Sequence, residues 1–199
     1  MSPRAYQRRR REDATAATRG RIIAAALELL TEPDGVVNFS IDAIARRADV
    51  ARMTVYYQFK SKRGLIEALF DDLGARAQLS ELGKAIGDPD ALRGLDTFIE
   101  AFVRFWAADR VVIYRLGALA ALDGEIQRAL RERRGWRREG IEKIVERTNA
   151  AGNDDVIDAL FMLTSFETFD TLTSSARTPA DVSRIVKALA RATVAGTPA

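Results

Sequence analysis

Apolar residues recur every three or four positions along most of the chain, and this helical spacing limits the possible folds more than any other feature of the sequence. Ile22, Ala26 and Leu30 show it near the N-terminus, and Leu95 and Phe98 show it near the middle. No segment alternates apolar and polar residues as a half-buried strand does, and we find no internal repeat. The sequence therefore predicts an all-α chain of about nine helices.

The residue types that are missing exclude several kinds of chemistry. The 199 residues include no His and no Cys, which removes disulfides, thiol nucleophiles, the commonest general base and the commonest metal ligand. We therefore expect no cofactor and no metal. No apolar run approaches the length of about 18 residues that a membrane span needs, and no apolar segment follows the N-terminal arginines. The sequence predicts neither a transmembrane helix nor a secretory signal, and we expect a cytoplasmic protein.

Positive charge is concentrated in the first third of the chain. The net charge is +3, with an excess of +6 over residues 1–63 and of −3 over the remainder. A basic end joined to a mildly acidic body is typical of a protein that meets a polyanion such as nucleic acid. The run Arg8–Arg11 lies in residues 1–12, which we interpret as a basic flexible arm. Such an arm can enter a DNA minor groove or stay solvated, and both interpretations remain open.

Residues 40–62 have the spacing of two short helices joined by a tight turn. Ser40 is a suitable N-cap, apolar residues then follow at helical spacing to Ala48, and Asp49–Val50 forms the turn before a helix over residues 51–57. The side chains that this second helix would expose are Arg52, Met53, Thr54, Tyr56 and Tyr57. Arginine can donate two hydrogen bonds to guanine, and threonine and tyrosine can contact a thymine methyl group or a phosphate. The segment therefore predicts a helix-turn-helix that fits a major groove.

At these positions the sequence resembles the tetracycline-repressor (TetR) family of bacterial transcriptional regulators. The family pattern has Ile-Ala in the second helix, a turn, and then Tyr-x-x-Phe-x-x-Lys with a Leu shortly after. In this chain these residues are Ile44–Ala45, Tyr56, Phe59, Lys62 and Leu65, and the match covers roughly residues 18–70.

Three positions depart from the family pattern. Asp49 stands where the family usually has Gly, and Asp tolerates the left-handed backbone of a turn better than most residues. Ala51 and Met53 replace the commoner Ser and small residue. These differences bear on base preference rather than on the fold.

The resemblance implies a homodimer in which each third helix enters the major groove of one half-site of double-stranded DNA. By the family pattern, the base-facing residues are Arg52, Met53, Thr54 and Tyr56, and the phosphate-binding residues are Ser40, Tyr57 and Lys62. The alternative is that the two tyrosines are core aromatics and that Lys62 is a solvated cap. We expect a three-helix DNA-binding domain over residues 13–62 and a helical effector-binding and dimerisation domain over residues 63–199.

In the second domain, the resemblance implies that the last two helices, at about residues 154–176 and 179–194, pack against a second subunit. The helix predicted from Asn153 to Ser174 is apolar on several sides, which independently favours a partner subunit, a ligand or a central core position. The candidate pocket residues are Phe102, Trp106, Tyr114, Met162, Phe166 and Phe169. They favour a hydrophobic or aromatic effector, although each could equally fill a core.

The long helix predicted from Asp123 to Ala150 contains a second basic cluster. Its members are Arg128, Arg131, Arg133, Arg134, Arg137 and Arg138. Because Glu132 and Glu139 lie among them, we interpret the cluster as a salt-bridged, solvated face rather than a second DNA site.

Together these observations predict a sequence-specific DNA-binding transcriptional regulator, a repressor that a small hydrophobic effector releases from a palindromic operator. One alternative is a helical protein-binding adaptor without DNA contact. Another is an enzyme that uses the carboxylate pairs Asp71–Asp72 or Asp154–Asp155, but adjacent residues on a helix point apart, and we do not expect an enzyme.

Overall fold

The computed structural model describes residues 3–196 and contains only helices over that range. The α-helices are α1 (Pro3–Thr31), α2 (Gly35–Asn38), α3 (Ile41–Arg47), α4 (Arg52–Phe59), α5 (Lys62–Arg76), α6 (Leu82–Ile86), α7 (Ala91–Ala108), α8 (Arg110–Leu122), α9 (Gly124–Val145), α10 (Asp154–Leu163), α11 (Phe166–Thr173) and α12 (Pro179–Ala195). A 3-10 helix, η1 (Leu79–Glu81), precedes α6. The all-α class is confirmed, and none of the helices described is long and apolar enough to cross a membrane.

The chain divides into two compact units that do not follow the linear order of the sequence. The first contains the chain up to Asp72 together with Tyr114–Ala129. The second contains Leu73–Ile113 and the chain from Leu130 onward. The helix-turn-helix predicted over residues 40–62 lies wholly in the first unit.

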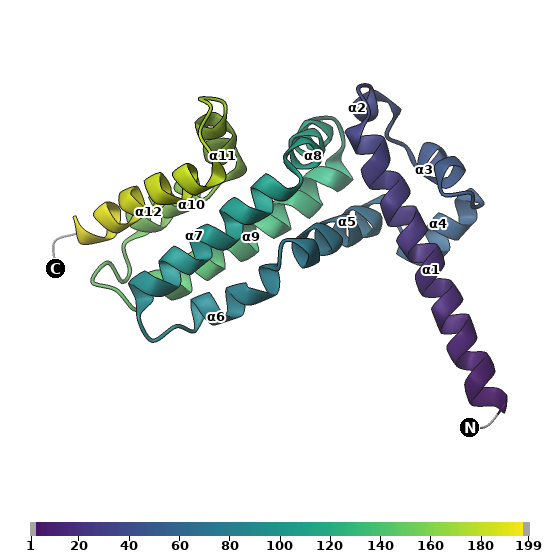
Figure 1. Cartoon of the computed structure of the whole chain (residues 1–199), viewed down its shortest axis with the longest axis horizontal. Helices are drawn as coiled ribbons and strands as arrows, with labels where there is room; N and C mark the ends of the chain where they lie inside the picture. Colours follow the sequence, from purple (N-terminus) through teal and green to yellow (C-terminus); the bar gives the residue numbers. More distant parts are fainter. Residues whose placement is uncertain (1–2, 197–199) are drawn as a thin grey trace. The chain divides into compact units, whose positions relative to one another are not determined.

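In the first unit, α1 packs on α3 and α3 packs on α4, as Figure 1 shows. The apolar stripes of these helices form the core, in which Ile22, Leu30 and Ile44 are fully buried together with Leu65 of α5. Burial of this kind, at about 1.5–3 kcal/mol for each large side chain, supplies most of the stability of such short helices.

The second unit is built on α7, which packs against α12, α11 and α6. Leu95 and Phe98 of α7 and Val182 and Val186 of α12 are buried in its core. The sequence Thr178-Pro179-Ala180-Asp181 predicts a capping box at the start of the last helix, because it supplies a cap hydroxyl and a carboxylate three residues later. The structure confirms it at the start of α12: Thr178 Oγ1 accepts a hydrogen bond from the Asp181 N–H, and the Asp181 carboxylate accepts one from the Thr178 N–H.

The chain forms twelve α-helices between residues 3 and 196, three more than the sequence predicted. Two are the short helices α2 and α6, which overlap the turn that Pro and Gly predict at residues 32–35 and the loop predicted at residues 83–90. The third arises because the helix expected from Asn153 to Ser174 breaks at Thr164–Ser165. The Ser165 side chain accepts a hydrogen bond from the Thr168 N–H and so caps a new helix, which makes the break favourable.

Three helix ends also differ from the sequence prediction. The structure continues α1 back to Pro3, so the backbone of residues 3–12, expected to be a separate flexible arm, is helical. The side chains of Arg8, Arg9 and Arg11 lie outside the described part of the structure, so their contact with DNA stays a prediction. The Asp88-Pro89 sequence predicts a cap at Asp88 for the helix that carries Leu95 and Phe98, but Asp90 caps this helix, α7. Helix α9 ends at Val145 rather than Ala150.

Candidate nucleic-acid interface

The turn between α3 and α4 is held by local backbone interactions. Ser40 caps α3 as predicted, with its Oγ 3.2 Å from the Ala43 nitrogen. At the other end of α3, the Val50 N–H donates to the Ala45 carbonyl over 3.0 Å. Asp49 adopts the left-handed conformation that the sequence predicted, with φ 52°. This geometry fixes the direction in which α4 leaves α3.

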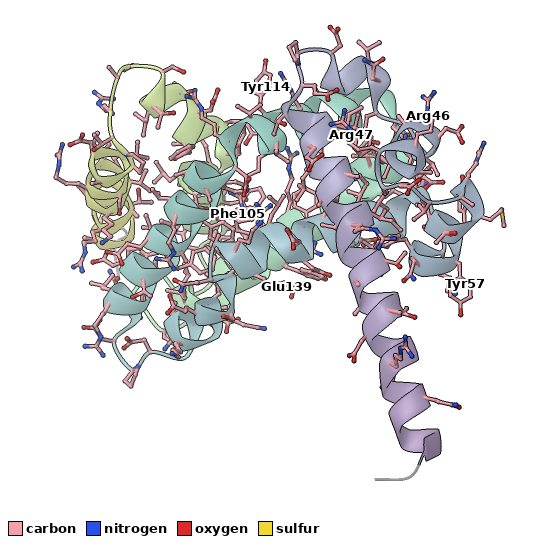
Figure 2. The ribbon with its side chains drawn as sticks, turned by 45° about the vertical axis from the view of Figure 1, so that its right-hand side comes forward. Arg46, Arg47, Tyr57, Phe105, Tyr114 and Glu139 are labelled. Atoms are coloured by element: carbon pink, nitrogen blue, oxygen red, sulfur yellow. The ribbon has the colours of Figure 1, made fainter. Side chains whose placement is uncertain are left out.

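Helix α4 has an inner apolar face and an outer exposed face. Val55 and Phe59 are 1% and 5% exposed and anchor the helix in the first unit. Met53 and Tyr57 are each 72% exposed, and Figure 2 shows the Tyr57 side chain pointing away from the ribbon. Tyr57 is therefore on the surface rather than in the core. Met53 and Tyr57 therefore take no part in the core.

Arg52 opens α4 on the same outer face. Its Nη1 lies 3.2 Å from Asp42 Oδ2 on α3, and its guanidinium lies 5.7 Å from the centre of the Tyr56 ring. A hydrogen bond with Tyr56 and the charge of Asp42 raise the pKa of Arg52 above its usual value. These contacts hold an exposed, charged donor next to Tyr56, where a base edge or a phosphate can be reached.

Thr54 and Tyr56 are half-buried and lie between the inner and outer faces of α4. Neither side chain is buried in the core, so both stay available for contacts at an interface. The sequence reasoning did not select Lys60, which follows α4, is exposed, and has its Nζ 5.4 Å from the centre of the Tyr57 ring. It also did not select Arg46, an exposed residue on α3 that Figure 2 labels. Their position beside the predicted helix is a signal that could have found them.

A second connection holds α4 against α1. The Arg19 guanidinium lies 4.4 Å from the centre of the Phe59 ring, and its Nη1 donates to the Gln58 carbonyl over 3.1 Å. One arginine therefore contacts both the side chain and the backbone at the end of α4. The contact orients the helix without using its outer face.

Lys62 is in an ion pair within the first unit. Its Nζ lies 2.7 Å from Asp123 Oδ2, and both side chains are 25% exposed. Burial works against ionisation of Asp123, but hydrogen bonds from Lys62 and from the Ile126 and Glu125 N–H groups outweigh it and lower the pKa of Asp123. A phosphate would have to replace this carboxylate to reach Lys62.

The first N–H groups of α5 also have partners. The Arg63 N–H donates to Glu125 Oε2 over 3.1 Å, and the Gly64 N–H donates to Ser61 Oγ over 3.0 Å. Free N–H groups at the start of a helix can bind phosphate, and the sequence predicts such a site at Ser40 and at Lys62. At Lys62, the start of α5 is covered by two carboxylates from the segment 123–125 and by its own N-cap. By contrast, the Ser40 side chain at the start of α3 is exposed.

Four of the six candidate pocket residues form one aromatic cluster in the second unit. The ring centres of Phe102 and Trp106 are 5.7 Å apart, those of Trp106 and Phe166 are 5.6 Å apart, and those of Phe166 and Phe169 are 6.4 Å apart. The cluster borders a cavity of only ≈ 10 Å³, about the space of one water molecule. Tyr114, which belongs to the first unit, and Met162 are 61% and 60% exposed and do not line this cavity.

The basic cluster of α9 is only partly a salt-bridged face. Arg134 pairs with Glu167 over 3.1 Å, and Arg138 pairs with Glu142 and with Asp158. Arg137, which was expected on the same solvated face, is only 7% exposed, and its Nη1 has no hydrogen-bond partner. The helical repeat explains this difference, because Arg137 faces α7 and α10, where it contacts Phe102 and Phe161.

Helices α3 and α4 have the geometry of a helix-turn-helix whose second helix is exposed on one face, and the second unit is also helical. Comparison with known proteins agrees with that class. Residues 22–69 match the sequence model of the family described as "Bacterial regulatory proteins, tetR family". No curated protein matches the sequence.

Solved structures with the same fold cover nearly the whole chain. A TetR-like transcriptional regulator from Rhodococcus sp. RHA1 has a TM-score of 0.61 at 22% identity, over 92% of this chain and 98% of its own. A second transcriptional regulator from the same organism has a TM-score of 0.68 at 17% identity, over 90% and 99%. A TetR-family transcriptional regulator from Thermus thermophilus has a TM-score of 0.55 at 17% identity, over 90% and 96%.

Residues 22–69 therefore have the sequence signature of the TetR family, and the described residues have the fold of the TetR-like regulators with which they were compared. Both findings support the resemblance seen in the sequence: the family match falls on the helix-turn-helix segment, and the fold agrees over the rest of the described chain.

Proposed function

We propose that this chain is a dimeric repressor that binds a palindromic operator and that a small hydrophobic effector releases from it. The observation that carries the proposal is the outer face of α4, where Met53 and Tyr57 are 72% exposed while Val55 and Phe59 of the same helix are buried. A helix that exposes large side chains without using them in its own core is suited to a major groove. Within the proposed interface, Arg52, Met53, Thr54 and Tyr56 contact bases, and Ser40, Tyr57 and Lys62 contact phosphates.

The proposed dimer forms through α10 and α12. These helices pack against each other in the second unit, and each exposes a large apolar side chain, Met162 at 60% and Leu189 at 48%. Exposed apolar side chains on neighbouring helices are typical of a surface that a partner covers. In the dimer, two copies of α4 would have to lie about 34 Å apart, or a small multiple of that distance, to reach successive major grooves.

The proposed effector binds in the second unit, at the aromatic cluster. Phe169 and Val186 both border the small cavity, so the site adjoins α11 and α12. An effector that separates these side chains favours a different arrangement of the dimer helices. It releases the DNA only to the extent that it binds that arrangement more tightly than the DNA-competent one.

Selection of bound fragments from random DNA tests the proposal. We expect a palindromic sequence whose half-sites are spaced by about one helical turn. The variant Tyr57→Ala should weaken binding to all sequences, whereas Leu122→Ala, which truncates an exposed side chain of α8, serves as a matched control. A protein-binding adaptor would instead show weak, sequence-independent retention of DNA, and an enriched site without two-fold symmetry would contradict the proposed dimer.

A further inference from the structure

A buried arginine in the second unit has no role in the DNA interface. Arg137 of α9 is 7% exposed, and its Nη1 is the one buried side-chain nitrogen or oxygen without a hydrogen-bond partner among the described residues. Arginine is rarely buried unless it is paired, because an unsatisfied charged donor costs free energy that packing alone does not return. A guanidinium of this kind requires an explanation beyond stability.

The surroundings of Arg137 are aromatic rather than acidic. Its guanidinium carbon lies 4.2 Å from the centre of the Phe161 ring and 5.8 Å from that of Phe102. Burial lowers the pKa of Arg137 to about 10, Glu167 acts in the opposite direction, and Arg134 lowers the pKa further. The side chain therefore keeps its charge at neutral pH.

The nearby carboxylate does not satisfy this charge. Glu167 accepts a hydrogen bond from Arg134 Nη2 over 3.1 Å, and its side chain is 68% exposed. Arg138, the next residue of α9, has Glu142 and Asp158 as partners. The neighbouring arginines are thus paired at the surface, whereas Arg137 points inward and keeps an unused donor.

The small apolar cavity lies next to one of the aromatic rings that contact Arg137, so it could hold the apolar body of a ligand. Phe102, which contacts Arg137, also borders the small cavity together with Trp106 and Phe169. The polar groups of this region already have partners: Trp106 Nε1 donates to the Thr164 carbonyl over 3.0 Å, and Thr164 Oγ1 donates to the Leu160 carbonyl over 2.9 Å. The unsatisfied polar group beside the apolar cluster is a cation.

We propose that the effector of this regulator is a small apolar carboxylate, held by its charged group at Arg137 and by its apolar body in the Phe102–Trp106 cluster. A carboxylate matches the planar fork of a guanidinium, and its single charge is neutralised by the single cation available. This inference rests on the proposed function, because it names the chemical class of the effector that the function requires.

Binding has to enlarge the site, because a cavity of ≈ 10 Å³ cannot hold an acid of several carbon atoms. The wall that can yield is the break between α10 and α11, since Leu163, Thr164 and Ser165 all border the cavity and interrupt the helical hydrogen bonding. Movement at this break would shift α10, which packs on α12. The same event that accommodates the acid would thereby reach the helices proposed to form the dimer.

The test measures binding of benzoate and octanoate to the full chain by thermal shift and calorimetry, with benzamide and octanamide as uncharged controls. We expect at least one acid, and neither amide, to raise the melting temperature of the natural protein. In Arg137→Met the affinity for the acid should fall at least about tenfold, whereas Arg134→Met, which changes a surface arginine one turn away, should leave it unchanged. Arg137→Lys keeps the charge but loses the fork, and its affinity should fall between the two.

The stability of the free variants provides a second readout. If Arg137 awaits a ligand, Arg137→Met removes an unsatisfied donor, and the free protein should melt at the same temperature or higher. A lower melting temperature for the free variant, unchanged acid binding by it, equal binding of acids and amides, or no response of the natural protein to either acid would each overturn the proposal.

The measurements of acid binding use no DNA, which separates this inference from the proposed function. Operator binding is measured in parallel on the same preparations. If the acid binds through Arg137 but does not change the operator affinity, the binding site is supported and its role in release is refuted. Tight operator binding without acid binding would refute the site and leave the repressor proposal standing.

Discussion

Replacement of Asp123 by asparagine should strengthen DNA binding. The Asp123 carboxylate accepts a hydrogen bond from Lys62 Nζ over 2.7 Å. Lys62 lies at the start of α5, where the proposed interface has a phosphate contact. In the free protein this carboxylate acts as an internal substitute for phosphate. The subunit bound at each half-site must therefore break its Lys62–Asp123 pair before Lys62 can bind a phosphate of the DNA.

The size of the effect follows from the burial of the pair. Both side chains are 25% exposed, so the pair is partly screened, and we assign it about 1 kcal/mol, the upper end for exposed pairs. Removal of this competition is worth roughly fivefold in affinity for one half-site and roughly 30-fold for a symmetric dimer with two. In the natural protein the carboxylate that Lys62 leaves takes up a counterion, which offsets the counterion that the phosphate contact of Lys62 releases. Asp123→Asn lacks this offset, so the dependence of log affinity on log salt concentration steepens by about 1 for each half-site.

The assay is fluorescence anisotropy on the selected operator at several salt concentrations. Asp34→Asn is the matched control, because it removes the same charge from an exposed position whose side chain makes no cap hydrogen bond. Competition between Asp123 and phosphate for Lys62 is refuted if Asp123→Asn gains no more affinity than Asp34→Asn, or if it gains affinity without a steeper salt dependence. The first result would mean that Lys62 does not contact phosphate, and the second that the gain comes from general electrostatics.

Three further results are expected. Arg52→Ala should relax base preference at one position of each half-site by about 1–3 kcal/mol, and a selection that returns the same consensus as the natural protein would contradict its base-reading role. Asp49→Gly should raise the free energy of unfolding by about 0.5 kcal/mol in a denaturant titration, because glycine adopts φ 52° without steric cost, and a lower midpoint would contradict this. The lowered pKa of Asp123 predicts a stabilising contribution that is present at neutral pH and is lost as the pH falls below about 4 through the folded pKa; acid unfolding of Asp123→Asn should lack this part of the pH dependence.

Local signals predicted most of the fold. The cap at Ser40, the left-handed residue at Asp49 and the capping box at Thr178 depend on short-range hydrogen bonds and backbone geometry, and all three are present. The same kind of signal at Ser165 was available, but the apolar periodicity around it favoured one continuous helix. The exposure of Met53 and Tyr57 also followed from helical spacing, since the buried residues of α4 fix which face turns outward.

The features that the sequence could not predict depend on contacts between distant segments. Nothing in the local pattern around Lys62 shows that Asp123, 61 residues away, would pair with it. Arg137 lies in a run of charged residues, and charge patterning alone predicted a solvated face. Its burial depends on where α7 and α10 place Phe102 and Phe161, which is a property of the packed unit rather than of the helix.

Different side chains of α4 anchor it in the core and face outward, and this separation affects how such a protein can be re-engineered. Because Val55 and Phe59 supply the anchoring and Met53 does not, Met53 can be randomised with little penalty to folding. A library at Met53, a proposed base-facing position, would vary the operator that is preferred while leaving the proposed phosphate contact of Tyr57 and the rest of the chain unchanged.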